Sequence, residues 1–256
     1  MKLSRRVALG GTELDQVDPS IVIRSIEIGT PKENVQAVSR MGGSGQRITG
    51  RHYDTAEVTV EFAIDIPKRR LADRREAFDK VIKWAMNAGW LTVNYMTGKK
   101  LYTEVAVLPG GVDIWNWTDG YSITFRAYAV PFWQDATATT STGASITVPG
   151  IAETVCDMEV TNGSGATVDS LTVQVGGSSM SFSSLGLADG ERLVIGHENN
   201  GTLYIRKYTG ASYYVRVMDK RTGGSADDLY VAPGTNAITV SGENMTWSVS
   251  CRGRYA

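Results

Sequence analysis

The chain has 256 residues, of which 42% are hydrophobic and 21% charged, and its formal net charge is -1 at pH 7. This length favours two domains over one, and the composition is typical of a folded globular protein, which argues against a largely disordered chain. The near-neutral charge argues against general nucleic-acid binding through a basic surface.

Two short strands are expected first, over residues 7–14 and 21–28, and Gly10-Gly11 suits a tight hairpin turn within the first. Residues 39–55, SRMGGSGQRITGRHYDT, are Gly-rich and positively charged, and they predict an exposed loop or an extended hairpin. The clearest strand pattern follows, because apolar residues alternate strictly with polar ones and so share one buried face. The apolar positions are Val58, Val60, Phe62, Ile64 and Ile66.

After Pro67 the pattern changes to helical spacing, in KRRLADRREAFDKVIKWAMNAG. The residues expected on the buried stripe of this helix are Leu71, Phe78, Ile82, Ala85 and Met86, and those expected outside it are Arg74, Arg75, Asp79 and Lys83. Gly89 suits a left-handed cap at the helix end. Three strands are then expected in WLTVNY, KLYTEVAVL and YSITFRAYAV. The first half is therefore predicted to be an α+β sandwich with one helix.

A domain boundary is expected where large aromatic residues give way to small polar ones, in FRAYAVPFWQDATATT. Pro131, Phe132 and Trp133 mark this seam, which predicts domains over residues 1–135 and 136–256, with residues 134–145 as a linker or an exposed crossing strand. Short strands separated by turn signals follow and predict an all-β sandwich. They are ETVCDMEV, SLTVQV, SSMSFSS, RLVIG, GTLYIRKY, SYYVRVMD, NAITVSG and MTWSVSCRGRY.

The sequence has no run of about 18 apolar residues, and its first residues lack the apolar region of a secretory signal. We therefore expect no membrane insertion, and folding in a cytoplasm. In that reducing compartment Cys156 and Cys251 are expected as small buried residues in neighbouring strands; the alternative is a disulfide that closes the second domain.

Candidate catalytic groups are few. His52 and His197 fall in different halves without a nucleophile motif and are expected at the surface or in turns. Asp227-Asp228 is typical of a solvated loop rather than a calcium site, and GGSGQRITG (42–50) lacks the Lys-Ser/Thr ending and the helix of a phosphate loop. Acidic residues that could form a hydrolytic pair in the second half are equally common on exposed strands; they are Glu153, Glu159, Glu191, Glu198 and Glu243. No catalytic, cofactor-binding or metal site is predicted.

Two sets of residues remain as binding candidates. Arg47, Arg51 and Tyr53 are of types favoured at protein interfaces, and we interpret their Gly-rich segment as a subunit contact. The aromatic residues of the second half are expected in the core or in cross-strand pairs, the alternative being a sugar-stacking platform. They are Tyr204, Tyr208, Tyr213, Tyr214 and Trp247.

Several of these segments, in this order, resemble the distal tail proteins of long-tailed bacteriophages and related prophages. The resemblance is carried by GSGQRITGRHYDTAEVTVEFAI, the Arg-rich helix, WAMNAGWLTVNY and WNWTDGYSITFRAYAVPFW, and in the second half by LYVAPGTNAITVSG. It covers nearly the whole chain and depends on patterns rather than on one diagnostic motif.

This resemblance implies a structural protein of the virion rather than an enzyme. Its first domain would form a hexameric hub ring, single or stacked, around a channel for DNA, and its second would be a galectin-like β-sandwich pointing outward. The ring would join the tail tube protein to a tail-associated lysin or fibre protein, after assembly in the host cytoplasm. By position, the segment Gly42 to Tyr53 would clasp the neighbouring subunit, with Arg47, Ile48, Arg51 and Tyr53 as contacts.

The second half departs from sugar-binding galectins, which carry a connected set of His, Asn, Arg, Trp and Glu. Near IGHENNGTLYIRKY only His197 and Glu198 match that set. A carbohydrate-binding module for host recognition is therefore the second interpretation, and a cell-wall hydrolase, which needs a carboxylate pair, is the third.

Overall fold

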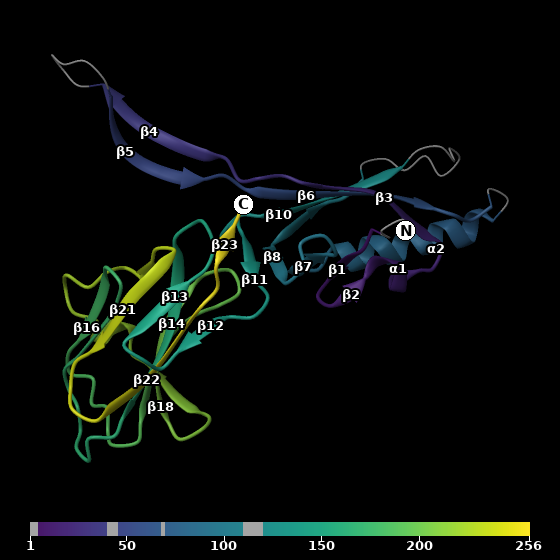
Figure 1. Ribbon diagram of the computed structural model, residues 1–256. Helices are drawn as coiled ribbons and strands as arrows, with labels where there is room; N and C mark the ends of the chain where they lie inside the picture. Colours follow the sequence, from purple (N-terminus) through teal and green to yellow (C-terminus); the bar gives the residue numbers. More distant parts are fainter. Residues whose placement is uncertain (1–4, 40–45, 68–69, 110–119) are drawn as a thin grey trace. The chain divides into compact units, whose positions relative to one another are not determined.

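The computed structural model describes residues 5–39, 46–67, 70–109 and 120–256 (Figure 1). The chain divides into two compact units, an N-terminal unit over Met1–Trp133, which also takes in Ala256, and a C-terminal unit over Gln134–Tyr255. Both are built mainly from antiparallel strands, so the predicted mainly-β fold class is confirmed. Within the described ranges no helix combines the length and the apolar character needed to cross a bilayer.

Two sheets and one long helix make up most of the N-terminal unit. In spatial order, one sheet contains β2 (Thr12–Glu13), β1 (Val7–Leu9), β7 (Gly89–Val93) and β8 (Lys99–Thr103), and the other contains β3 (Ile21–Ile28), β6 (Ala56–Ile64), β10 (Tyr121–Ala127) and β9 (Val105–Val107). The turn between β1 and β2 is the predicted Gly10-Gly11, at φ 59 and 85°. A single turn of helix, α1 (Leu14–Val17), was not predicted.

The segment KLYTEVAVL, predicted as one strand, forms two strands in different sheets. Glu104 separates β8 from β9, and its carboxylate accepts hydrogen bonds from the backbone N–H groups of Tyr128 (2.5 Å) and Ala129 (3.2 Å). These bonds tie the break between the two strands to the residues that follow β10.

Strand β6 has the predicted alternation as far as Ile64, whereas Ile66 lies beyond the end of the strand and is only half-buried. Val58, Val60 and Phe62 are fully buried and Ile64 nearly so, whereas Thr59 on the opposite face bonds across to Thr124 in β10 (3.0 Å). Burying each such apolar side chain contributes about 1.5–3 kcal/mol, so this strand anchors the core of the unit.

The helix α2 (Leu71–Ala85) exists as predicted, but its buried stripe differs. Met86 is 69% exposed, whereas Arg74 is only 2% exposed. The prediction sorted these positions by polarity, but residues three and four apart share one face of a helix whatever their polarity. The buried positions are Arg74, Ala77, Phe78, Val81, Trp84 and Ala85. Gly89 does not cap the helix either, because it is the first residue of β7.

The C-terminal unit is a sandwich of two antiparallel sheets, as predicted. One contains β12 (Thr139–Ser141), β22 (Met245–Cys251), β14 (Thr154–Asn162), β17 (Arg192–His197), β18 (Leu203–Thr209) and β19 (Tyr213–Arg216), and β20 (Tyr230–Val231) also pairs with β14. The other contains β13 (Ser145–Val148), β21 (Gly234–Val240), β15 (Leu171–Val175) and β16 (Ser178–Phe182). The remaining elements are β11 (Trp133–Asp135), which spans the division between the units, η1 (Met218–Lys220) and β23 (Arg254–Tyr255).

One apolar core fills the C-terminal sandwich, and fully buried Val160, Val173 and Ile195 come from three of its strands. All eight predicted strand segments of this half are strands. Residues 134–145 are not a plain linker, since β12 pairs with β22 along the edge of the larger sheet.

Candidate subunit interface

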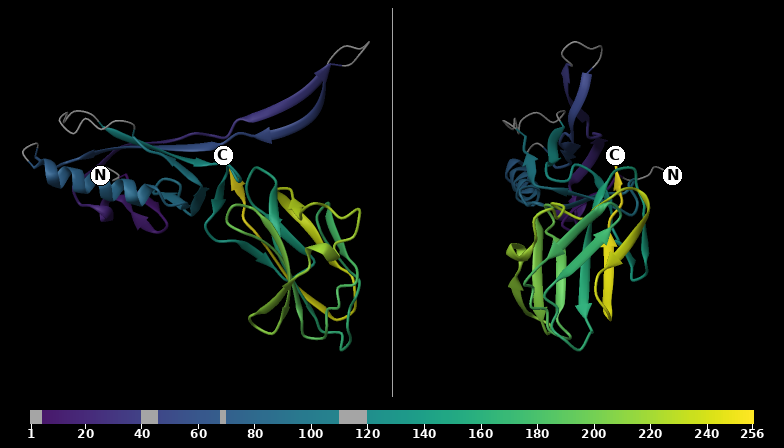
Figure 2. Two further views of the ribbon diagram at one scale, coloured as in Figure 1. Left: turned by 180° about the vertical axis from the view of Figure 1, so that it is seen from behind. Right: turned by 90° about the vertical axis from the view of Figure 1, so that its left-hand side faces the viewer.

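Strands β4 (Glu33–Ser39) and β5 (Gln46–Tyr53) form a hairpin that continues the β3–β6 ladder (Figures 1 and 2). At its base the Asp54 N–H donates to the Lys32 carbonyl (2.9 Å). A β-bulge lies between Gln36 and Ala37, opposite Thr49, whose hydroxyl donates to the Gln36 carbonyl (3.2 Å). Bulges increase the local twist of a strand pair, so the hairpin departs from the plane of the parent sheet.

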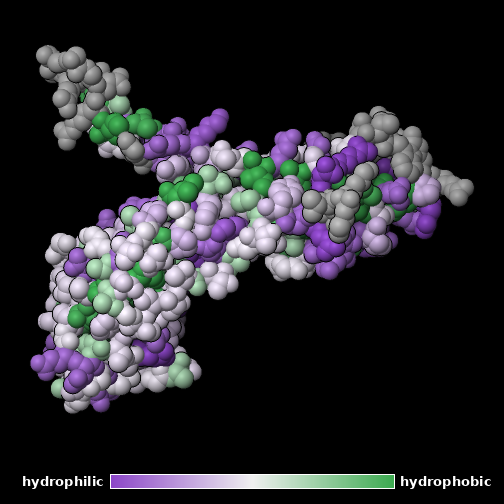
Figure 3. All heavy atoms as spheres, viewed as in Figure 1, coloured by the Kyte–Doolittle hydropathy of each residue, from purple (hydrophilic) through white to green (hydrophobic). Residues whose placement is uncertain are grey.

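One face of the hairpin carries several apolar residues, and by the register it also includes the positions of Glu33 and Arg51. The register pairs Ala37 with Ile48, and residues that lie directly opposite share a face. Val35 is on that face because side chains repeat every second residue along β4, and Tyr53 joins it at the base. Val35 and Ile48 are each 48% exposed. Figure 3 shows apolar residues gathered on the outer part of this hairpin.

The hairpin leaves both of its outer strand edges unpaired in the described part of the chain. Among the described strands, β4 and β5 pair only with each other. An isolated two-stranded hairpin is marginally stable in water, and exposed strands with apolar side chains are sites of association. Its shape and apolar face therefore suit a contact with another molecule.

The predicted contact residues divide into two groups. Ile48 lies on the exposed apolar face, whereas the Tyr53 ring at the base packs edge-on against Phe132, with 4.7 Å between ring centroids. Arg47 and Arg51 are in β5 by their backbone, and their side chains lie outside the described residues. The predicted tip, residues 40–45, also lies outside them.

Pro131, Phe132 and Trp133, predicted to mark the domain seam, are all buried. The division between the two compact units falls directly after Trp133. The contact between Phe132 and Tyr53 ties this stretch to the base of the hairpin, a link that sequence reasoning missed because 79 positions separate the two rings in the chain.

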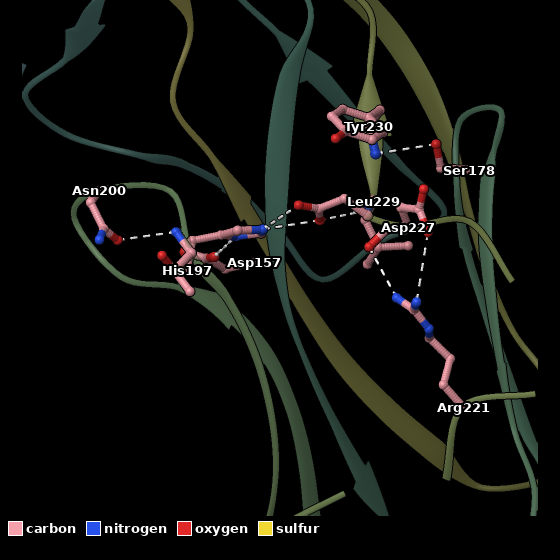
Figure 4. Close-up of polar contacts among 10 residues, drawn as sticks. Asp157, Ser178, His197, Asn200, Arg221, Asp227, Leu229 and Tyr230 are labelled. Atoms are coloured by element: carbon pink, nitrogen blue, oxygen red, sulfur yellow. Dashed lines mark hydrogen bonds and ion pairs between the residues drawn. The ribbon is translucent and has the colours of Figure 1, made fainter. Parts of the chain in front are cut away.

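A partly buried ionic cluster lies in the C-terminal unit, centred on His197 (Figure 4). The His197 side chain is 8% exposed, with Nδ1 2.7 Å from Asp157 Oδ1 and Nε2 2.9 Å from both carboxylate oxygens of Asp228. Asp228 also accepts the Leu229 N–H (2.7 Å). Along β14, Thr154 and Val155 pair with β20, and the residues from Met158 onward pair with β17. Asp157 of the cluster lies between these two stretches. The cluster therefore joins three segments of the sandwich.

The prediction of a surface histidine is correct for exposed His52 and wrong for His197. Burial by itself lowers the pKa of His197, but hydrogen bonds to Asp157 and Asp228 and the charge of both carboxylates outweigh it and raise the pKa to about 9. The imidazolium form is therefore held between two carboxylates at neutral pH. A period-two pattern through Leu193 and Ile195 would have placed His197 toward the interior, a signal available from the sequence.

The cluster predicts a loss of stability at alkaline pH. The folded-state pKa of His197 is raised from 6.5 to about 9. The contribution of His197 to the free energy of unfolding is therefore complete below pH 6.5 and disappears as the pH rises through 9. We expect the free energy of unfolding to fall by about 3 kcal/mol over this window, at about 1.4 kcal/mol per unit of pKa difference. Urea unfolding at several pH values measures it, and a constant free energy across the window would contradict the assignment.

Three of the five acidic residues considered for hydrolysis form ion pairs with basic side chains, among them Glu191 with Lys207 (3.5 Å). Glu159 pairs with Arg192 (3.1 Å), and Glu198 with Arg206 (3.2 Å). Asp227 is exposed, as predicted for a solvated loop, but Asp228 is not. Among the described residues, no group of three or more His, Cys, Asp or Glu side chains is placed to hold a metal ion.

Four of the five aromatic candidates contact other residues of the C-terminal unit, whereas Tyr213 is 69% exposed. Tyr208 and Tyr214 lie opposite each other on β18 and β19, with 5.4 Å between ring centroids. The indole N–H of Trp247 donates to the Gly143 carbonyl (3.1 Å), and its ring packs against the core. Tyr204 stacks with the Arg206 guanidinium. These contacts favour the cross-strand interpretation over a sugar-stacking platform.

Comparison with solved structures identifies the architecture. The Dit protein of phage SPP1 matches 98% of this chain and 99% of its own, with a TM-score of 0.67 and 11% sequence identity. This chain has the fold of that hub protein. SPP1 Dit is described as a paradigm of the hub adsorption apparatus in phages that infect Gram-positive bacteria. At the level of the fold, the resemblance to distal tail proteins is confirmed.

The hub fold extends over both units, because the match leaves almost no residue of either chain uncovered. Chains of the phage p2 baseplate in its activated conformation also match, at 9% identity and TM-scores of 0.47 with Sr and 0.45 with Ca. They cover 96% and 97% of this chain and 98% of each baseplate chain. No family model matches the sequence, and comparison with curated proteins gives no match.

Proposed function

We propose that this chain is a structural, non-enzymatic component of a phage tail tip. Six copies form a hub ring, single or stacked, that joins the tail tube protein to a tail-associated lysin or fibre protein and leaves a channel for DNA. Residues 1–135 build the ring and residues 136–256 form the outer domain. The ring assembles in the bacterial host cytoplasm and becomes part of the virion.

The full-length match to the hub fold carries this proposal, since it includes both units at a TM-score of 0.67. The hairpin adds a physical reason for self-association. A ring needs a head-to-tail contact in which one surface of each copy meets a different surface of the next. The face that carries Val35 and Ile48 projects from the parent sheet and is half exposed, as one side of such a contact requires.

The size and outline of the purified full-length protein test this proposal. Analytical ultracentrifugation over a range of concentrations, with negative-stain images of the same samples, should give particles of six copies, or of two stacked sixes, with a central hole. A stable dimer, or a particle of any size without a hole, would contradict it. The outline matters as much as the mass, because a closed hexamer without a channel would not pass DNA.

A further inference from the structure

Two cysteines face each other inside the C-terminal sandwich. Cys156 in β14 lies directly opposite Cys251 in β22, and both are free thiols. Their residues are 0% and 3% exposed, and both side chains belong to the apolar core. The predicted arrangement, small buried residues in neighbouring strands, is thus confirmed, and the pairing register adds that the two strands place the thiols side by side.

The backbone hydrogen bonds reveal how close the two residues are. The Cys156 N–H donates to the Leu229 carbonyl (3.0 Å), on the edge of β14 that faces away from β22. In an antiparallel strand the N–H and C=O of one residue point to the same side, so Cys156 and Cys251 form a non-hydrogen-bonded pair. Such pairs have Cα atoms about 4.5 Å apart, inside the range of about 4.4–6.8 Å found for disulfides.

The two thiols also interact with each other. The neighbouring Cys251 thiol, with burial, raises the pKa of Cys156 well above its usual range. The Cys156 thiol in turn lowers the pKa of Cys251, against the opposing effect of burial. Cys251 is therefore the better nucleophile of the pair, and Cys156 is its immediate neighbour.

We propose that Cys156 and Cys251 form a cross-strand disulfide on exposure to a small-molecule disulfide, and that this bond closes most of the C-terminal unit into one covalent loop. The Cys251 thiolate attacks the oxidant, forming a mixed disulfide and releasing one small thiol. The Cys156 sulfur then attacks the bonded Cys251 sulfur and releases the second small thiol, with the proton of each protein thiol passing to a released thiol. The protein loses two electrons and the oxidant gains them.

Access to Cys251 requires only a local opening. The short edge strand β12 covers this part of β22, with Thr139 opposite Cys251. Edge strands with few partners open at a lower cost than the core does. Once formed, the bond removes loop-closure entropy from the unfolded chain over roughly 100 residues, so it stabilises the unit strongly.

In the proposed tail-tip role the thiols remain reduced while the protein assembles in the cytoplasm, and they oxidise after the particle leaves the cell. That timing rests on the proposed function. The chemistry of the pair does not, because the purified protein can be oxidised whatever its assembly state.

Oxidised glutathione is the probe for the experiment. The folded protein is incubated with it, acid-quenched, and examined by intact mass and by thiol titration after denaturation. We expect a loss of about 2 mass units without an adduct, a fall from two titratable thiols to none, and reversal by dithiothreitol. The unfolding temperature of the C-terminal unit should rise by roughly 10 °C. Two remaining thiols, or a stable glutathione adduct, would overturn the proposal.

Matched variants separate the disulfide from other effects of the oxidant. Cys156→Ala removes the resolving thiol, so it should retain a glutathione adduct on Cys251 or remain unmodified, and it should show no rise in unfolding temperature. The double variant Cys156→Ala, Cys251→Ala gives the baseline for the unfolding temperature. If the native protein forms the disulfide without any rise above its reduced form, the stabilising role is wrong.

Discussion

His197→Gln is expected to lower the free energy of unfolding of the C-terminal unit by about 3 kcal/mol, because removing one partner from a buried ion pair leaves an uncompensated charge. The charge left behind is that of Asp228, whose side chain is only 10% exposed. Of the hydrogen bonds described for this carboxylate, only the one from the Leu229 N–H would remain. Urea unfolding followed by circular dichroism at about pH 7 measures the change.

Two comparisons decide whether the cluster is responsible. Asp157→Asn should cost less than about 1 kcal/mol, since the Asp157 side chain is 53% exposed and exposed ion pairs contribute little. The His197→Gln variant should also lose the decline in stability between pH 6.5 and 9, because the titrating group is gone. If the variant unfolds at the same urea concentration as the native protein, His197 is not a structural link between the strands.

Val35→Asp combined with Ile48→Asp is expected to disperse the proposed ring into monomers that are still folded. Each apolar side chain buried in the contact contributes about 1.5–3 kcal/mol, so losing both weakens association by at least about two orders of magnitude before the cost of burying two charges is added. Both positions are half exposed in the single chain. The change should therefore have little effect on its own unfolding.

Asn34→Asp with Gln36→Asp is the matched control. Both residues are in β4 of the same hairpin, and the pairing register places them on the face opposite to Val35 and Ile48. It adds the same two charges and should leave the particle size nearly unchanged in analytical ultracentrifugation. Dispersal by both double variants would mean that charge alone opens the assembly. An unchanged particle with the Val35 and Ile48 variant would remove the apolar face from the interface.

Local patterns in the sequence were enough to predict most strands. In β6 a strict alternation from Val58 to Ile64 gave both the strand and its buried face, because side chains of an extended chain repeat every two residues. The helix shows what such patterns do not predict. Its existence followed from the periodicity, but its buried face was misassigned at Arg74 and Met86, since the side chain's own polarity does not say which neighbour covers it.

The candidate interface could be predicted as a segment and only partly as residues. The Gly-rich composition of residues 39–55 indicated an exposed loop or an extended hairpin, and Ile48 was among the residues chosen from it. Val35 was not, because β4 carries no alternation strong enough to indicate a strand. Its place on the apolar face follows from the pairing with β5, including a bulge at Thr49 that shifts the register.

By itself, the sequence determined a mainly-β chain with one long helix and a C-terminal sandwich, since each of these depends on short-range periodicity and turn chemistry. Only the tertiary structure decided which distant residues meet. His197 contacts Asp228, which lies 31 positions away in the sequence. Cys156 lies opposite Cys251 because β14 and β22 pair in the folded sandwich. Contacts of this kind depend on strand order and register, which long-range packing selects from many alternatives that the local pattern allows equally well.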